Sequence, residues 1–336
     1  MIKKKTFVLL SILLLFLITS PLFFEIYRTA VFNTVPRDDY APYLLALIGE
    51  NGQIPNPTYV YRVLSVTIAI PFYYLLPVYY FTNLSNADVP YLKATQALSF
   101  VSYVSLVVTA LIIYAIARKK FNARVESSFI VGVLSFFLSN YISKIGIDPF
   151  VILIISLLVF YIKNPRVFLP LAFISIAINE KISVIFATIF IFRFFISIKN
   201  HRKFGYFYQL LFSCGGVLIY LVVTYGLRLP GNEVQTNPKY FISSFQSSLF
   251  NTMSIKGLYF NILPVVILLL IIFLVIKFRR QSFFDVSDVS AFFVLLILAL
   301  LTTKGYNIGR IVMHSYPLYL PYLVFFIDDI FRINKS

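Results

Sequence analysis

Long apolar runs follow one another along most of this chain and leave room for few kinds of fold. One run extends from about Ala94 to Ala117 and ends at the basic cluster Arg118-Lys119-Lys120. Only 12% of the 336 residues are charged, whereas about 25% is usual in a soluble domain. Within a bilayer the backbone must satisfy its own hydrogen bonds, so only helices or closed barrels span it. Runs such as Val265–Ile276 lack the alternation of barrel strands, so the sequence predicts an all-α, polytopic membrane helix bundle.

The other apolar runs vary in length, and several are shorter than the ~20 residues of a full membrane span. Interior helices, or helices that stop at a cavity, explain short runs. After a first run at Phe7–Phe24 and the proline-broken segment Val63–Tyr80, the remaining runs are Ser128–Ser143, Pro149–Ile162, Val167–Ile178, Ser183–Ile198, Gln209–Leu227, Tyr259–Ile276, Ala291–Thr303 and Val312–Ile327.

The positions of the basic residues predict the topology, because short cytoplasmic loops of membrane proteins are rich in Lys and Arg. If Val63–Tyr80 does not cross the membrane, most of the 29 basic residues fall on one side. Their clusters are Lys3–Lys5, Arg118–Arg124, Lys163 with Arg166, Lys199–Lys203, Lys277–Arg280, and Arg332 with Lys335. We therefore expect one integral-membrane domain, residues 1–336, with about ten transmembrane helices, a retained first helix and both termini in the cytoplasm. Residues 25–92 then form a first outer loop with non-crossing interfacial helices, and residues 228–258 form another outer loop.

Charge and residue types argue against other classes of protein. The formal net charge is +16, but the basic residues stand between apolar runs, which indicates topology rather than nucleic acid binding. Cys214 is the single cysteine of the sequence, so neither a disulfide framework nor a cysteine-based metal site is available. His201 and His314 cannot form a zinc site between them. We predict no metal site and no cofactor, and leave a dependence on divalent metal open.

The outer face collects charged residues of both signs at the ends of short helices. Ionisable residues near or within a membrane are candidates for function, and a shared cavity in the outer leaflet is the expected arrangement. The main members of this set are Asp38, Asp39, Glu50, Arg62, Asp88, Lys144, Asp148, Glu180, Lys181, Lys304, Arg310 and His314.

An adjacent acidic pair opens a short helical pattern in the first outer loop. Asp38-Asp39-Tyr40 precedes apolar residues at helical spacing, and two glycines follow at positions 49 and 52. Both carboxylates therefore lie at the N-terminus of a predicted surface helix. A carboxylate there is a helix cap, and the same environment keeps it ionised and able to accept a proton. The two roles are compatible.

Two acidic positions in later outer turns have structural and functional interpretations. Asp148 before Pro149 fits the start of a helix, with a role in shaping an acceptor site as the alternative. Glu180 and Lys181 interrupt an apolar hairpin directly after Asn179, which can cap the following helix. An unlike pair at that position suggests a stabilised cation that faces a cavity.

The remaining basic candidates could either bind a phosphate group or anchor the protein at the membrane surface. Lys304, Arg310 and His314 fall in one predicted outer loop, Lys304–Ser315, whose glycines permit close approach to a ligand. Phosphate binding and juxtamembrane anchoring fit these residues equally. The arginine of Tyr61-Arg62 offers a planar fork that matches a phosphate, or it extends towards lipid headgroups beside aromatic anchors.

These motifs resemble the GT-C superfamily of polytopic glycosyltransferases, which includes dolichyl-phosphate-mannose-dependent mannosyltransferases and bacterial relatives. In that family an acidic pair and a Tyr precede a short amphipathic helix, and a Tyr-Arg dipeptide opens a non-crossing helix. The corresponding residues here are Asp38-Asp39-Tyr40, the run Tyr40–Leu47, and Tyr61-Arg62. Asp148-Pro149 and Glu180-Lys181 are similar to later motifs of some bacterial members. The resemblance covers about the first third of the chain, with weaker similarity to residue 181, and departs from the eukaryotic members at Val63-Leu64-Ser65, where they have a proline.

The resemblance implies a hexosyltransferase of the cell envelope that uses a polyprenyl-phosphate-linked sugar on the outer, periplasmic face of a bacterial inner membrane. Asp38 or Asp39 would be the general base. The donor phosphate would be bound by Arg62, Lys181, Lys304 and Arg310, with Tyr40, Tyr61, Asp148, Glu180 and His314 in support. The acceptor, whether lipid, glycan or protein, is not identified. The alternatives are an envelope polysaccharide polymerase, a transporter or flippase without catalysis, and a membrane scaffold.

Overall fold

Every regular element in the described part of the chain is a helix, which confirms the predicted all-α class for those residues. The computed structural model describes residues 40–50, 63–76, 89–139, 148–201, 203–222, 238–278, 286–302 and 307–333. Within them, four helical stretches are long and apolar enough to cross a membrane, namely Val89–Lys120, Glu180–Lys199, Ile255–Phe278 and Ile308–Phe331. Several shorter apolar helices accompany them. These stretches are compatible with a membrane protein, and the figure of about ten crossings is not confirmed.

Most of the helices follow the apolar runs of the sequence, with some extended or broken, whereas α12 lies outside these runs. They are α2 (Tyr40–Leu47), α3 (Val63–Thr67), α4 (Ile70–Leu75), α5 (Val89–Lys120), α6 (Val125–Ser139), α7 (Asp148–Phe160), α8 (Pro165–Ile176), α9 (Glu180–Lys199), α10 (Phe207–Leu221), α12 (Pro238–Thr252), α13 (Ile255–Gly257), the π-helical turn η4 (Leu258–Ile262), α14 (Leu263–Phe278), α15 (Val286–Thr302), α16 (Ile308–Met313), α17 (Tyr316–Tyr319), the 3-10 turn η5 (Leu320–Tyr322) and α18 (Leu323–Ile333).

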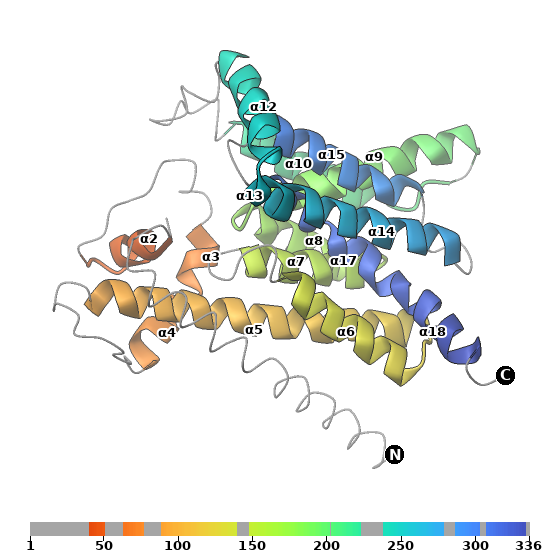
Figure 1. Ribbon diagram of the computed structural model, residues 1–336, viewed down its shortest axis with the longest axis horizontal. Coiled ribbons are helices and arrows are strands. Elements are labelled where there is room, and N and C mark those ends of the chain that lie inside the picture. Colours follow the sequence, from red (N-terminus) through yellow and green to blue (C-terminus); the bar gives the residue numbers. More distant parts are fainter. Residues whose placement is uncertain are drawn as a thin grey trace, which may run out of the picture.

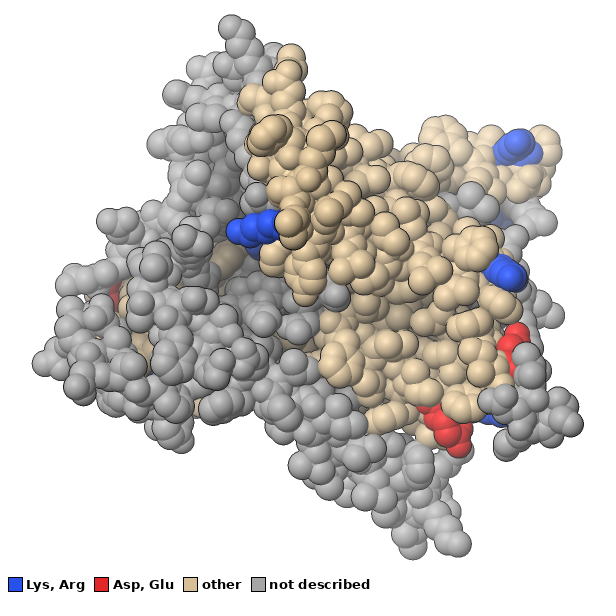
Figure 2. All heavy atoms as spheres, in the orientation of Figure 1, with Lys and Arg blue, Asp and Glu red and all other residues tan. Residues whose placement is uncertain are grey.

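Several helices of the bundle end in turns that contain basic residues. In Figure 1, α5, α9 and α14 run from left to right, so their C-terminal turns lie at the same end. Those turns contain Arg118–Lys120, Lys199 and Lys277. On the face shown in Figure 2, Lys and Arg side chains lie mainly along the right-hand edge, over the ends of α9 and α14, beside a broad uncharged area. The left-hand end carries α2, α3 and α13, together with the starts of α5 and α14 (Figure 1).

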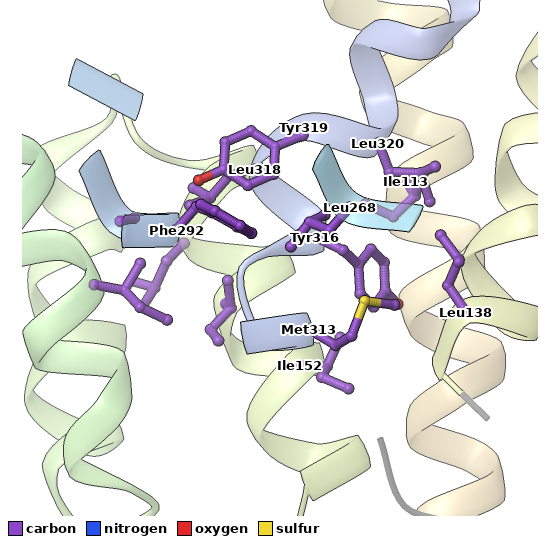
Figure 3. Packing of buried hydrophobic residues seen from close by; sticks show 14 of the residues in the cluster. Ile113, Leu138, Ile152, Leu268, Phe292, Met313, Tyr316, Leu318, Tyr319 and Leu320 are labelled. Atoms are coloured by element: carbon purple, nitrogen blue, oxygen red, sulfur yellow. The ribbon is translucent and has the colours of Figure 1, made fainter. Parts of the chain in front are cut away.

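The C-terminal apolar run forms a broken helix that passes through the centre of the hydrophobic core. Breaks between α16 and α18 coincide with Pro317 and Pro321, which lack the backbone N–H that a continuous helix needs. Tyr316 and Tyr319 of this run are fully buried, and the Tyr316 hydroxyl lies 3.0 Å from Ser135 Oγ. Figure 3 shows the run surrounded by core side chains from α5, α6, α7, α14 and α15: Ile113, Leu138, Ile152, Leu268 and Phe292.

The described part of Val63–Tyr80 consists of two short helices, and the expectation that it does not cross the membrane stays a prediction. Helices α3 and α4 contain five and six residues, far fewer than the ~20 needed to span a bilayer. They meet at Ile68-Ala69, immediately before Pro71 in the first turn of α4. Helix α4 packs along α5, so this segment lies against the bundle.

Helix α2 forms where the acidic pair predicted a short helix, but it is not the surface helix that was expected. Gly49 follows it with a φ of +79°, the left-handed conformation that commonly ends a helix. Its residues Tyr40, Ala41, Tyr43, Leu44 and Leu45 are buried, because its apolar residues occur on more than one face and pack against α3 and α5.

The close contact of α16 with η4 and α14 provides a test of the packing. We expect Gly309→Ala to lower the free energy of unfolding by about 1–3 kcal/mol, the usual cost of overpacking. A Cβ at this position would lie 2.2 Å from the Phe260 carbonyl oxygen and 2.7 Å from Pro264 Cγ. The thermal unfolding midpoint of the purified protein in detergent measures the effect.

The matched control is Gly215→Ala in α10, where nothing lies within 4 Å of the added Cβ. That change should be neutral or stabilising by up to about 1 kcal/mol, because Ala favours a helix over Gly. An unchanged or higher midpoint for Gly309→Ala would contradict the close packing of α16.

Candidate functional site

The most distinctive polar site in the described residues is centred on the buried carboxylate of Asp148. This residue begins α7 and is 2% exposed. Its Oδ2 accepts a hydrogen bond from Arg310 Nε, and its Oδ1 lies 3.2 Å from His314 Nε2. Arg310 and His314 are four residues apart at the end of α16, so they share one helix face. Each carboxylate oxygen therefore has its own partner from α16.

The sequence around Asp148 explains why a carboxylate is tolerated there. Pro149 suits the first turn of a helix because its missing N–H has no partner there in any case. The N-terminal N–H groups of α7 carry partial positive charge that favours a nearby anion. The start of α7 at Asp148 agrees with the predicted helix start, and the side chain of Asp148 joins α7 to α16. Burial of the charge is offset by Arg310, since a buried charge is costly unless it is paired.

His314 is fully buried and has an oxygen near each ring nitrogen. Its Nδ1 lies 3.2 Å from the Ile311 carbonyl oxygen, and its Nε2 faces Asp148. A neutral imidazole donates through one nitrogen only, so only the protonated ring donates to both oxygens. The prediction of an outer loop over Lys304–Ser315 is wrong for residues 308–314. Residues 308–313 form α16, and His314 is fully buried.

A third segment adds a cation to the site. Asn179 caps α9 as predicted, since its Oδ1 accepts a hydrogen bond of 3.0 Å from the Lys181 backbone N–H. This cap starts α9 with Glu180 and Lys181 in its first turn. The Lys181 ammonium is close enough to interact electrostatically with both Asp148 and His314. We call Asp148, Lys181, Arg310 and His314 the Asp148 cluster; it joins α7, α9 and α16.

The structure places only part of the predicted site. It brings together Lys181 and Arg310 of the predicted phosphate-binding residues, and Asp148 and His314 of the supporting ones. Tyr40 is buried in α2, and Glu180 is half-buried at the start of α9. Asp38, Asp39, Tyr61, Arg62 and Lys304 lie outside the described residues, so the predicted hollow shared by the acidic pair and the cations stays a prediction.

Sequence reasoning missed Asn261, which fixes the position of α16. This residue is 1% exposed in η4. Its Nδ2 donates to Thr252 Oγ1 at 3.1 Å, and its Oδ1 accepts from the Ile308 backbone N–H at 3.1 Å. One side chain thus joins the ends of α12 and η4 to the first turn of α16. The available signal was an isolated amide inside the apolar run Tyr259–Ile276, since polar groups within membrane runs are usually bonded or functional.

No protein-family model, curated protein or solved structure matches this chain. In the described part of the chain, no three His, Cys, Asp or Glu side chains are grouped as metal ligands. In the Asp148 cluster, one buried carboxylate is paired with an arginine and lies 3.2 Å from a histidine, and a lysine of α9 adds positive charge.

Proposed function

We propose that this protein is a glycosyltransferase of a bacterial inner membrane, with about ten transmembrane helices and both termini in the cytoplasm. It moves a sugar from a polyprenyl-phosphate-linked donor to an acceptor on the outer face. The observation that carries this proposal is the ion pair of Arg310 with the buried Asp148, to which Lys181 at the start of α9 adds positive charge. Helices α7 and α9 run from this cluster towards the end that carries the basic residues, as the charge rule requires if the cluster faces outward.

In this proposal Arg310 and Lys181 bind the phosphate of the donor. A departing lipid phosphate needs positive charge held in place before the reaction, and a guanidinium matches phosphate geometry better than an ammonium does. Asp148 is buried, but the Arg310 side chain is 37% exposed. The pair therefore combines a buried anchor with a guanidinium that a ligand can reach.

The proposed general base is Asp38 or Asp39, with Arg62 and Lys304 as further phosphate ligands. An acceptor hydroxyl oxygen attacks the anomeric carbon, the bond to the phosphate oxygen breaks, and polyprenyl phosphate leaves as an anion. The hydroxyl proton passes to the carboxylate. Support comes from α2, which begins at Tyr40, directly after Asp39, and packs against α5 and α3 at the end of the bundle where α5 begins (Figure 1).

Donor consumption in proteoliposomes tests the function. The full chain is reconstituted with a polyprenyl-phosphate hexose and an extract of membrane acceptors, and the release of polyprenyl phosphate is followed by mass spectrometry. We expect release that depends on the protein and on the acceptor extract. Movement of intact donor across the bilayer without release would instead support a flippase and contradict the proposal.

A polysaccharide polymerase is the second candidate, and the placement of Arg310 on α16 favours it, because such enzymes also use outer-face arginines. The comparison of variants separates the two functions. A transferase with an aspartate base should lose activity in Asp38→Ala or Asp39→Ala. If both variants keep activity and loss of Arg310 abolishes it, the polymerase is the better assignment.

A further inference from the structure

Helix α12 turns two serines towards the protein and most of its large apolar side chains outward, where Gln246 is also exposed. Ser244 and Ser248, one turn apart, are fully buried. Ile242, Leu249 and Met253 lie on the opposite side, at helical spacing, and are exposed. A helix on the surface of a water-soluble protein has the reverse polarity, so α12 is suited to a non-aqueous environment.

The buried side of α12 has the composition of a helix contact within a membrane. Its main neighbour is α15. Small residues such as Ser, one turn apart, let two helices approach closely where lipid supplies no hydrophobic driving force. The sequence analysis placed residues 228–258 in an outer loop, but residues 238–252 form this helix.

The exposed apolar side chains of α12 are followed along the chain by those of a candidate membrane span, with Lys256 exposed between them. Phe250, Met253 and Ile255 are each more than four-fifths exposed. The exposed apolar surface then follows η4 into α14, through side chains that include Leu258, Val266, Leu270 and Phe273. Because α14 belongs to the apolar stretch Ile255–Phe278, the same non-aqueous phase that surrounds α14 is the expected environment of α12.

The orientation and charge of α12 fit a helix that lies in the membrane plane. In Figure 1 it stands at a steep angle to α14, at the end of the bundle where α14 begins. The sequence has Lys239 at its start and Lys256 just after it, and no Asp or Glu between residues 238 and 278. Interfacial helices combine such an apolar face with basic residues that interact with anionic headgroups.

We propose that α12 is an interfacial anchor whose apolar face inserts among lipid acyl chains, independently of the proposed enzymatic function. The last residue of α12, Thr252, is hydrogen-bonded to Asn261, which also binds the first turn of α16. The lipid contact of α12 is thereby connected to the helix that carries Arg310 and His314.

Single tryptophans test this placement, since the sequence contains no tryptophan. Leu249→Trp and Met253→Trp place the probe on the apolar face, and Asn200→Trp is the control at an exposed position directly after α9, away from that face. Each full-length variant is reconstituted in phosphatidylcholine vesicles with or without bromine on the acyl chains. The bromine is placed about 5–10 Å below the headgroup boundary, the depth reached by interfacial helices. Size-exclusion profiles identical to that of the parent protein establish that the variants are folded.

We expect emission from the two apolar-face variants to lie at shorter wavelength than that of Asn200→Trp. Brominated lipid should quench them severalfold more strongly than the control, and aqueous iodide should quench them less than the control. Strong quenching by iodide would overturn the proposal by placing the face in water. Quenching by neither agent would overturn it by showing that protein, such as a second copy of the chain, covers the face.

Discussion

Arg310→Gln is expected to lower the rate of sugar transfer by about 10²- to 10³-fold, the usual effect of removing one group that stabilises developing negative charge. Glutamine retains a polar amide but loses the positive charge that the leaving phosphate needs. Because this charge develops as the glycosidic bond breaks, the loss should appear mainly in kcat. Release of polyprenyl phosphate at saturating donor, per mole of folded protein, measures it.

The comparison of three variants separates phosphate binding from a general effect of charge. Arg310→Lys should have an intermediate rate, since an ammonium keeps the charge and loses the planar fork. Arg166→Gln removes an equal charge from an exposed position in the first turn of α8 and should transfer sugar at the parent rate. If Arg310→Gln also keeps the parent kcat, Arg310 is not a phosphate ligand.

The apolar pattern predicts most helices because hydrophobic burial decides where they form. The predicted run Pro149–Ile162 became α7 (Asp148–Phe160), and Ser183–Ile198 became α9 (Glu180–Lys199). In both cases the helix begins earlier than the apolar run because Asp148 and Asn179 supply starting signals. The cap of α9 by Asn179 was predicted because an asparagine side chain can accept a hydrogen bond from the first turn of a helix.

The apolar pattern of the sequence could not predict which residues far apart in the chain come into contact. Asp148 contacts partners that are 162 and 166 residues away, and no local spacing relates them. In the sequence alone, the glycine at 309 and the charged residue Arg310 favoured a loop. The structure makes this stretch helical, because Asp148 pairs with the arginine and the glycine admits the backbone of η4. Helix α12 was missed as a helix because its serines resemble loop residues until their burial is known.

Asp148→Asn is expected to lower the free energy of unfolding by about 2–3 kcal/mol. The change keeps the size of the side chain and removes its charge, so Arg310 and His314 lose the anion that they share. Removal of one partner from a fully buried ion pair costs about 3–5 kcal/mol. The smaller value applies here because the Arg310 side chain is 37% exposed and can recover part of its solvation. Reversible unfolding in mixed detergent measures the difference.

A double-mutant cycle shows whether this loss comes from the Asp148–Arg310 pair. In the Asp148→Asn/Arg310→Gln double variant no guanidinium is left beside the neutral amide. Residues in direct contact are not additive, so the double variant should be less destabilised than the sum of the two single changes. Asp328→Asn in α18, whose carboxylate accepts from Ser127 Oγ and is partly exposed, is a control for the loss of one carboxylate elsewhere and should cost less. Additive losses would show that Asp148 and Arg310 contribute independently, and that the buried carboxylate does not hold the arginine of α16 in place.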